Sequence, residues 1–266
     1  MAEYSYDHED GEAYFSAKRD DYPACSKPSQ RGLDGASKNL KNNQFYRDKF
    51  KVNEFGYRSD EFTDVHEKKH VLFAGCSVAY GDGMDLEGIW ARKIYDKINE
   101  HEETSGYYNI GSNGASPMEI MNLIFQYINK FGMPDVIFVG FPEFYRDISE
   151  KDMTEKLAGI QAVWFDRMLK WLSGMCEARG AQLYMFRWNH NWGERGDVIH
   201  NYMTHKEYIH YDNLEAMHFA HQYSSDHEGE EWVLVGWDDG HPGKAFHQFW
   251  YEMLYREYAR RNGIND

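Results

Sequence analysis

The stretch HEKKHVLFAGCSVAYGDG, residues 66–83, decides the fold of this chain. Its centre, HVLFAGC at 70–76, is a short, continuous apolar run that predicts a strand buried on both faces. Ser77 follows this run directly, so the strand would deliver a serine hydroxyl to its carboxyl end. The stretch opens with HEKKH, a pattern that zinc proteases carry on a helix. The segments around the stretch decide between these two signals.

Further apolar runs alternate with longer amphipathic segments. The runs at 107–111, 135–140 and 181–188 predict strands, and the segments at 86–99, 116–132, 153–179 and 243–261 predict helices. Helix 116–132 has the clearest boundaries, because Ser116 and Glu119 form a capping box and Gly132 ends the pattern. This alternation, with continuous apolar strands, indicates an α/β fold in which helices cover both faces of a central parallel sheet.

The chain divides into a polar N-terminal part and one α/β domain. Residues 1–50 lack a clear period and predict an N-terminal extension that wraps the domain or is partly mobile, whereas residues 51–266 form the domain. Within it, residues 189–231 are less regular and carry seven histidines. We interpret them as an insertion or long loop region beside the site, with a helix around 205–221.

Composition and charge limit the classes of protein and partner. The chain has 266 residues, 42% of them apolar, which is enough for a folded core. The net charge of −15 makes nucleic acid and membrane surfaces unexpected partners. The three cysteines are too scattered for a disulfide framework. Because no signal peptide or membrane-length apolar stretch is visible, we expect a cytoplasmic protein. The oligomeric state stays open.

The carboxyl ends of parallel strands meet at one edge of a sheet, where ligands bind in open α/β folds. Each predicted strand is followed there by glycine or functional side chains, and one more such segment precedes the last helix. In chain order these segments are Gly75-Cys76-Ser77, GSNGAS (111–116), FPEFYR (141–146), NHNW (189–192) and DDGHPG (238–243). Their convergence predicts that this rim carries the functional site.

Three residues of the rim supply the parts of a serine hydrolase site. A serine becomes a nucleophile when a base takes its proton, and the base needs an acid to orient it. Asp238 can pair with Nδ1 of His241, three residues later, and leave Nε2 for Ser77. The backbone N–H groups of Ser77 and Gly114 are the expected oxyanion donors. This chemistry needs no cofactor.

These motifs resemble the blocks of the SGNH (GDSL) hydrolase family. FAGCSVAYGDG is similar to the first block, with Cys76 where the family has Asp, while NIGSNGAS is similar to the second block and DDGHP to the last. VNEFGYRSDEF, residues 52–62, resembles an N-x-x-G-x-R segment of some members. The resemblance covers most of residues 70–260 in element order. It implies a flavodoxin-like, three-layer α/β/α fold and ester hydrolysis through an acyl-serine intermediate.

One block departs from the family pattern. The third family block is G-x-N-D, whose Asn completes the oxyanion hole, whereas this chain has Gly140-Phe141-Pro142-Glu143. Proline offers no donor, and losing one oxyanion donor lowers turnover by roughly a hundred- to a thousandfold. Arg146, or Asn113 on the neighbouring loop, is expected to stand in for it.

Other patterns point to different chemistry. HEKKH lacks the helix that would turn both histidines toward one metal, and we interpret it as a solvated turn before the strand. Cys76 is an alternative nucleophile, although a cysteine beside Ser77 is expected to point into the sheet packing. The histidines of 189–231 have irregular spacing, so structural or surface histidines are favoured over a metal site.

The segment FRWNHNW, residues 186–192, is the best candidate for a substrate wall. Trp188 and Trp192, with His190 between them in the sequence, would stack on a sugar, or the two rings would pack beneath the loop. The sequence therefore predicts a serine esterase of the SGNH type that acts on an acyl ester, such as an O-acetyl ester of a carbohydrate. A non-catalytic glycan-binding or structural protein on the same fold and an acyltransferase with the same triad stay open.

Overall fold

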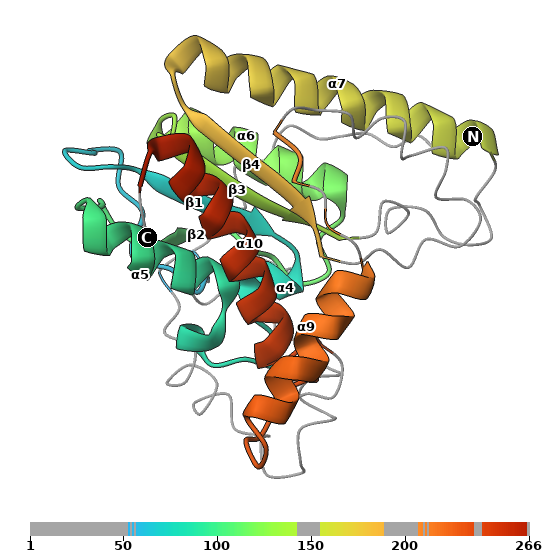
Figure 1. Cartoon of the computed structure of the whole chain (residues 1–266). Coiled ribbons are helices and arrows are strands. Elements are labelled where there is room, and N and C mark those ends of the chain that lie inside the picture. The colour runs from blue at the N-terminus through green and yellow to red at the C-terminus, as the bar shows by residue number, and fades with distance from the viewer. Residues whose placement is uncertain are drawn as a thin grey trace.

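The computed structural model describes residues 53, 55, 57–142, 155–188, 207–209, 211, 213–236 and 241–264 (Figure 1). The strands are β1 (Val71–Gly75), β2 (Tyr108–Asn109), β3 (Val136–Phe141) and β4 (Gln182–Arg187). The helices in these ranges are α4 (Ser77–Tyr80), the 3-10 helix η2 (Leu86–Gly88), α5 (Trp90–His101), α6 (Pro117–Phe131), α7 (Glu155–Arg179), α9 (Asn213–Asp226) and α10 (Lys244–Asn262).

The described strands form one parallel sheet in the order β2-β1-β3-β4. Phe73 of β1 pairs with Phe138 of β3, which in turn pairs with Tyr184 of β4, so three aromatic residues stand in one row across the sheet. Beyond β4, a parallel bridge joins Met185 to Tyr208. The strand order is that of flavodoxin-like sheets, which confirms the predicted fold class.

Alternate residues of the strands face two helical layers. The rings of Phe73, Phe138 and Tyr184 stack in sequence, with centroids 5.3 and 4.8 Å apart. This row faces the layer of α5 and α10, in front of the sheet in Figure 1. On the opposite face, Phe141 packs edge-on against Phe165 of α7, with centroids 5.1 Å apart, and α6 lies beside α7. The sheet is therefore buried on both sides, as its continuous apolar strands predict.

Local signals account well for the start of α6, whereas α5 and α9 depart from their predicted bounds. α6 starts with the predicted capping box, in which the Glu119 N–H donates to Ser116 Oγ (3.2 Å) and the Ser116 N–H donates to the Glu119 carboxylate (2.8 Å). α5 starts at Trp90, later than predicted, because residues 86–88 form a 3-10 turn and Ile89 is extended. α9 begins and ends later than the helix expected around 205–221.

The HEKKH segment is not a helix; Glu67 and Lys68 form an exposed bend, whereas its last histidine is buried. The rings of His66 and His70 stack with centroids 3.6 Å apart, and His70 Nε2 lies 2.8 Å from the Tyr127 hydroxyl. Only 2% of His70 is exposed, and this burial, with His66 nearby, lowers its pKa to about 3. The two lysines form ion pairs with Glu102 and Glu103. The prediction of a solvated turn is therefore wrong for His70, which ring stacking and the tyrosine hydroxyl hold in the core.

Two predicted regions lie wholly or partly outside the described residues. These are the N-terminal extension, residues 1–50, and the first part of the irregular region 189–231. In the part of the chain that the structure describes, no helix is both long and apolar enough to cross a membrane.

Candidate functional site

β1 ends in a tight turn that presents Ser77 at the carboxyl edge of the sheet. Cys76 is extended and precedes α4, so Ser77 is the first residue of that one-turn helix. Gly75 makes this turn possible, because a Cβ there would lie 2.6 Å from the Cβ of Ala79 and 2.7 Å from the carbonyl oxygen of Gly140. Ser77 is 5% exposed, so its hydroxyl is sheltered.

The structure brings His241 onto this hydroxyl. The two residues are 164 positions apart in the sequence, and Nε2 of the imidazole lies 2.9 Å from Ser77 Oγ. This separation is within the range that direct proton transfer requires. Asp238 lies outside the described residues, so its pairing with Nδ1 of His241 stays a prediction.

A strap of residues 232–236 holds the segment that carries His241. The Gly236 N–H donates to the His241 carbonyl oxygen at 2.8 Å, and Val235 forms an antiparallel bridge with Pro242. A Cβ on Gly236 would lie 2.7 Å from the carbonyl oxygen of Gly83, in the turn that follows α4. The strap therefore ties the histidine segment to the turn just beyond the nucleophile helix.

The strap also caps the start of α10. The first N–H groups of a helix lack partners within the helix. Here the Lys244 N–H donates to the Trp232 carbonyl oxygen (3.0 Å) and the Ala245 N–H to that of Val233 (2.9 Å). A Cβ on Gly243 would lie 2.5 Å from the Trp232 oxygen, so a side chain at this position would push the strap and α10 apart.

The GSNGAS loop, residues 111–116, lies against the nucleophile turn. The Ser112 N–H donates to the Gly75 carbonyl oxygen at 2.9 Å, and a Cβ on Gly111 would lie 2.4 Å from the nitrogen of Tyr80. Gly114 has a φ of 75°, in the left-handed region, and a Cβ added to it would meet no neighbouring atom within 4 Å. The two expected oxyanion donors therefore belong to neighbouring segments of the rim, and their roles stay predictions.

Pro142 directly follows β3 on the same rim. The last residue pair between β1 and β3 is Gly75 with Gly140, and the buried Pro142 comes two residues after this pair. Its nitrogen carries no hydrogen and cannot donate. Of the two expected substitutes, Asn113 lies half-buried in the GSNGAS loop, and Arg146 lies outside the described residues.

Trp188, the residue after β4, contacts the nucleophile turn. Its indole Nε1 donates to the Sγ of Cys76 at 3.1 Å, and Cys76 has no exposed surface. The thiol thus lies in the packing beside the indole rather than on the surface. The Trp188 side chain is half-buried, and its contact with a substrate stays a prediction. His190 and Trp192 lie outside the described residues.

The histidine-rich region is described from residue 207 onward, with gaps. His218 and His221 are exposed on α9, and the ring of His227 stacks on Tyr223 with centroids 3.9 Å apart. Among the residues with described positions, no three His, Cys, Asp or Glu side chains gather in a way that could hold a metal ion.

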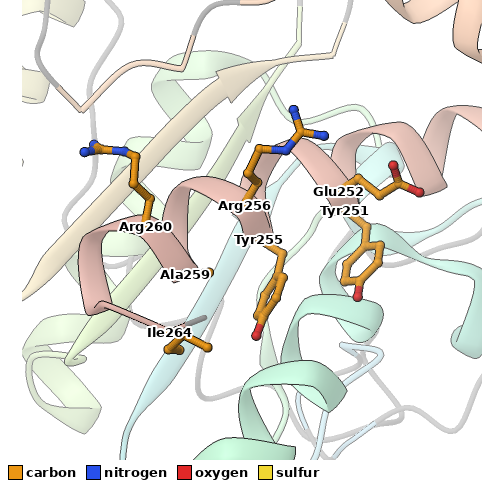
Figure 2. Close-up of a pocket in the computed structure, with 7 residues that line it drawn as sticks. All are labelled: Tyr251, Glu252, Tyr255, Arg256, Ala259, Arg260 and Ile264. Atoms are coloured by element: carbon orange, nitrogen blue, oxygen red, sulfur yellow. The ribbon is translucent and has the colours of Figure 1, made fainter. Parts of the chain in front are cut away.

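A surface cavity of about 460 Å³ lies along the C-terminal half of α10. Figure 2 shows the rings of Tyr251 and Tyr255 on one side of the helix and the guanidinium groups of Arg256 and Arg260 on the other. Tyr251 is about 10 Å along the axis from the first residue of α10, which adjoins the His241 segment. This cavity is therefore separate from the Ser77–His241 pair.

The 232–236 strap is an element that the sequence prediction missed, although its residues, WVLVG, form a short continuous apolar run of the kind that predicts strands elsewhere in the chain. Its backbone partners, in the segment before α10 and in the turn after α4, follow from the structure, where a Cβ on Gly236 or Gly243 would collide with backbone.

No protein-family model matches the sequence, and no curated protein matches it significantly. Among solved structures, the chain is similar to the psychrotrophic esterase EstA from Pseudoalteromonas sp., with 14% identity, 73% of this chain and 98% of that chain covered, and a TM-score of 0.47. It is also similar to the acetyl xylan esterase AlAXEase (15% identity, 70% and 98% covered, TM-score 0.44). A third similar structure is a protein assigned to the G-D-S-L lipolytic family from Desulfitobacterium hafniense (11% identity, 70% and 97% covered, TM-score 0.41). These neighbours are thus named as two esterases and one lipolytic protein assigned to the G-D-S-L family, all at low sequence identity to this chain.

Proposed function

We propose that this protein is a serine esterase of the SGNH type, with Ser77 as nucleophile and His241 as general base and acid. The observation that carries the proposal is the 2.9 Å separation between His241 Nε2 and Ser77 Oγ. The two residues belong to the blocks that the sequence motifs single out, and they meet at the carboxyl edge of a parallel sheet, where ligands bind in such folds. Asp238 is proposed to orient the imidazole by accepting from Nδ1.

The proposed reaction proceeds in two halves. His241 Nε2 takes the Ser77 hydroxyl proton while Oγ bonds to the ester carbonyl carbon, and the backbone N–H groups of Ser77 and Gly114 donate to the resulting oxyanion. The bond to the alcohol oxygen then breaks, and His241 passes its proton to the departing alcohol. In the second half, water loses a proton to His241, adds to the acyl-serine and releases the acid, which restores the Ser77 hydroxyl.

The proposed substrate is a small acyl ester, such as an O-acetyl group on a carbohydrate. Trp188 supports this choice, because it is half-buried beside the nucleophile turn and offers an aromatic surface to a sugar. Trp192 and His190 are proposed to extend the same wall. An acyltransferase would use the same three catalytic residues with an alcohol acceptor in place of water.

Turnover of p-nitrophenyl acetate tests the proposed function. We expect measurable turnover by the wild type and loss of it in Ser77→Ala, with Ser225→Ala as a matched control on the exposed face of α9. Addition of carbohydrate acceptors separates hydrolysis from transfer, because a transferase would form acylated acceptor at the expense of free acetate. A folded wild type that shows no turnover, while glycan binding is measurable, would favour the non-catalytic alternative.

The oxyanion hole has its own test, because Pro142 removes one expected donor. Asn113 and Arg146 are proposed as substitutes, so Asn113→Ala or Arg146→Ala should lower kcat by roughly a hundredfold with a smaller change in KM. Full activity in both variants would rule out this assignment without affecting the roles of Ser77 and His241.

A further inference from the structure

A buried arginine lies beneath the far end of the nucleophile helix. Arg58 has no exposed surface, and its Nη1 donates to three backbone carbonyl oxygens: those of Tyr80 (3.3 Å), Gly81 (2.6 Å) and Met84 (3.1 Å). These carbonyls belong to the last turn of α4 and the turn that follows it. Arg58 therefore satisfies backbone acceptors that a helix terminus leaves without intrahelical partners.

α4 needs such support because it is a single turn. Isolated short helices are unstable, since one turn fixes several residues for very few hydrogen bonds. The Ser77 carbonyl oxygen accepts from the N–H groups of Gly81 (2.8 Å) and Asp82 (3.0 Å). Gly81 thus binds Ser77 through its N–H and Arg58 through its carbonyl. This chain of contacts runs from the guanidinium to the backbone of the nucleophile.

The charge of Arg58 suits this position. Burial lowers its pKa, and the nearby Tyr80, Tyr107, Asp82 and Asp85 side chains oppose that shift. An arginine stays protonated even when buried, so a full positive charge faces the negative end of the α4 backbone dipoles. A guanidinium can also reach several carbonyls at once, which a lysine ammonium on its flexible stem does less well.

The segment that carries Arg58 is held in place by its own contacts. Asn53 Oδ1 accepts from the N–H groups of Phe55 (3.1 Å) and Tyr57 (3.0 Å), which closes a tight turn just before the arginine. Directly after it, Ser59 Oγ donates to the Tyr107 carbonyl oxygen (2.9 Å) beside β2. The guanidinium is therefore presented to α4 from a fixed segment.

We infer that Arg58 is a positioning residue that acts through α4 to hold Ser77 Oγ in reach of His241. The effect of Arg58 on turnover rests on the proposed function. The anchoring of α4 by Arg58 rests on the contacts of α4 alone. The N-x-x-G-x-R segment then has a defined role in this chain: its Asn53 shapes the turn, and its Arg58 fixes the nucleophile.

Kinetics of Arg58→Met and Arg58→Lys test the inference. Because a small misplacement of a catalytic group costs roughly a hundredfold in rate, kcat of Arg58→Met should fall about ten- to a hundredfold with KM within about twofold. Arg58→Lys should recover part of the loss. Arg261→Met is the matched control, since Arg261 Nη1 also donates to a backbone carbonyl, that of Leu183 (3.1 Å), at the opposite end of the sheet. Full kcat in a folded Arg58→Met, or a loss of the same size in Arg261→Met, would overturn the inference.

Hydrogen exchange gives a second measurement that needs no catalysis. The amides of Gly81 and Asp82 should exchange at least about tenfold faster in the Arg58 variants, while amides of β4 keep their protection. If Arg58→Met does not fold, Arg58→Lys carries both measurements. If the wild type shows no turnover but the Arg58 variants still exchange faster, the proposed function fails and the anchoring of Ser77 by Arg58 stands. Normal turnover with unchanged exchange in both variants would defeat only the role of Arg58.

Discussion

A histidine forms a hydrogen-bond contact with a hydroxyl group at each end of β1. At the amino end, His70 Nε2 lies 2.8 Å from the Tyr127 hydroxyl; at the carboxyl end, His241 Nε2 lies 2.9 Å from Ser77 Oγ. By distance alone, the two pairs are equivalent. They differ in what surrounds them.

The amino-end pair is sealed in the core. Burial is the main cause that lowers the pKa of His70 to about 3, and the neighbouring His66 is a smaller one. Burial also raises the pKa of the Tyr127 phenol. Near neutral pH, neither group therefore gains or releases a proton readily. The carboxyl-end pair is placed differently: His241 is half-buried on a loop, and Ser77 is the first residue of a helix beside two glycine-containing segments.

A histidine–hydroxyl hydrogen bond alone therefore does not define a catalytic site. A nucleophile also needs a base that can accept a proton at working pH and open space in which a substrate carbonyl can approach. A catalytic pair and a structural pair with similar N···O distances should respond differently to substitution.

The largest expected difference follows from the same substitution at both ends. His241→Asn removes the proposed base and should lower ester turnover at least about a thousandfold, whereas His70→Asn should leave turnover within about twofold. Steady-state kinetics with p-nitrophenyl acetate measures both. Equal losses in the two variants would mean that the pairs do not differ in function.

A smaller loss is expected when the strap is displaced. In Gly243→Ala, the new Cβ would meet the Trp232 carbonyl oxygen at 2.5 Å, so the segment carrying His241 must shift. We expect turnover to fall about ten- to a hundredfold and the free energy of unfolding to fall by about 1–3 kcal/mol. Kinetics and urea unfolding of the same preparation report the two effects. Unchanged values for both would show that the strap does not position His241.

The amino-end pair should contribute to stability alone. Tyr127→Phe leaves the buried His70 Nε2 without its partner and should lower the free energy of unfolding by about 1–3 kcal/mol, with turnover unchanged within about twofold. Urea unfolding at pH 7 measures the first quantity. A substantial loss of turnover in a variant that stays folded would assign this pair a catalytic role.

The smallest effect is a difference in acid sensitivity. His70 takes up a proton near pH 6.5 when unfolded but only near pH 3 when folded, so the unfolded state binds more protons between these values. Stability should therefore fall as the pH drops below about 6.5, by roughly 1.4 kcal/mol per pH unit for this histidine. His70→Asn should reduce that slope, measured by urea unfolding at pH 7, 6 and 5. The buried His247, whose pKa is also lowered to about 3, leaves a residual slope in the variant.

Local patterns in the sequence predicted the layered fold well. The strands at 71–75, 136–141 and 182–187 lie within one or two residues of the predicted runs, because continuous apolar residues identify buried strands. α6 matches closely, because Ser116 and Glu119 make their own N-terminal cap. Ser77 and His241, predicted as a pair from separate motifs, lie within hydrogen-bond distance.

Contacts between distant segments were harder to anticipate. The charges of HEKKH indicate a solvated turn, yet ring stacking and Tyr127 place His70 in the core. Arg58 belongs to a segment that the motif singled out, but its hydrogen bonds are to carbonyls more than 20 residues away. The apolar run of the 232–236 strap is a strand signal, but its partners, the segment before α10 and the turn after α4, cannot be read from the run itself.

The central claim is that the carboxyl-end pair, and not the amino-end pair, activates a hydroxyl group. Fluorophosphonate labelling followed by peptide mass mapping tests this claim directly, because the probe reports which hydroxyl acts as a nucleophile. We predict one adduct, on Ser77, that disappears in Ser77→Ala and is absent from Tyr127. A folded protein that takes up no label, or an adduct that persists in Ser77→Ala, would contradict the account.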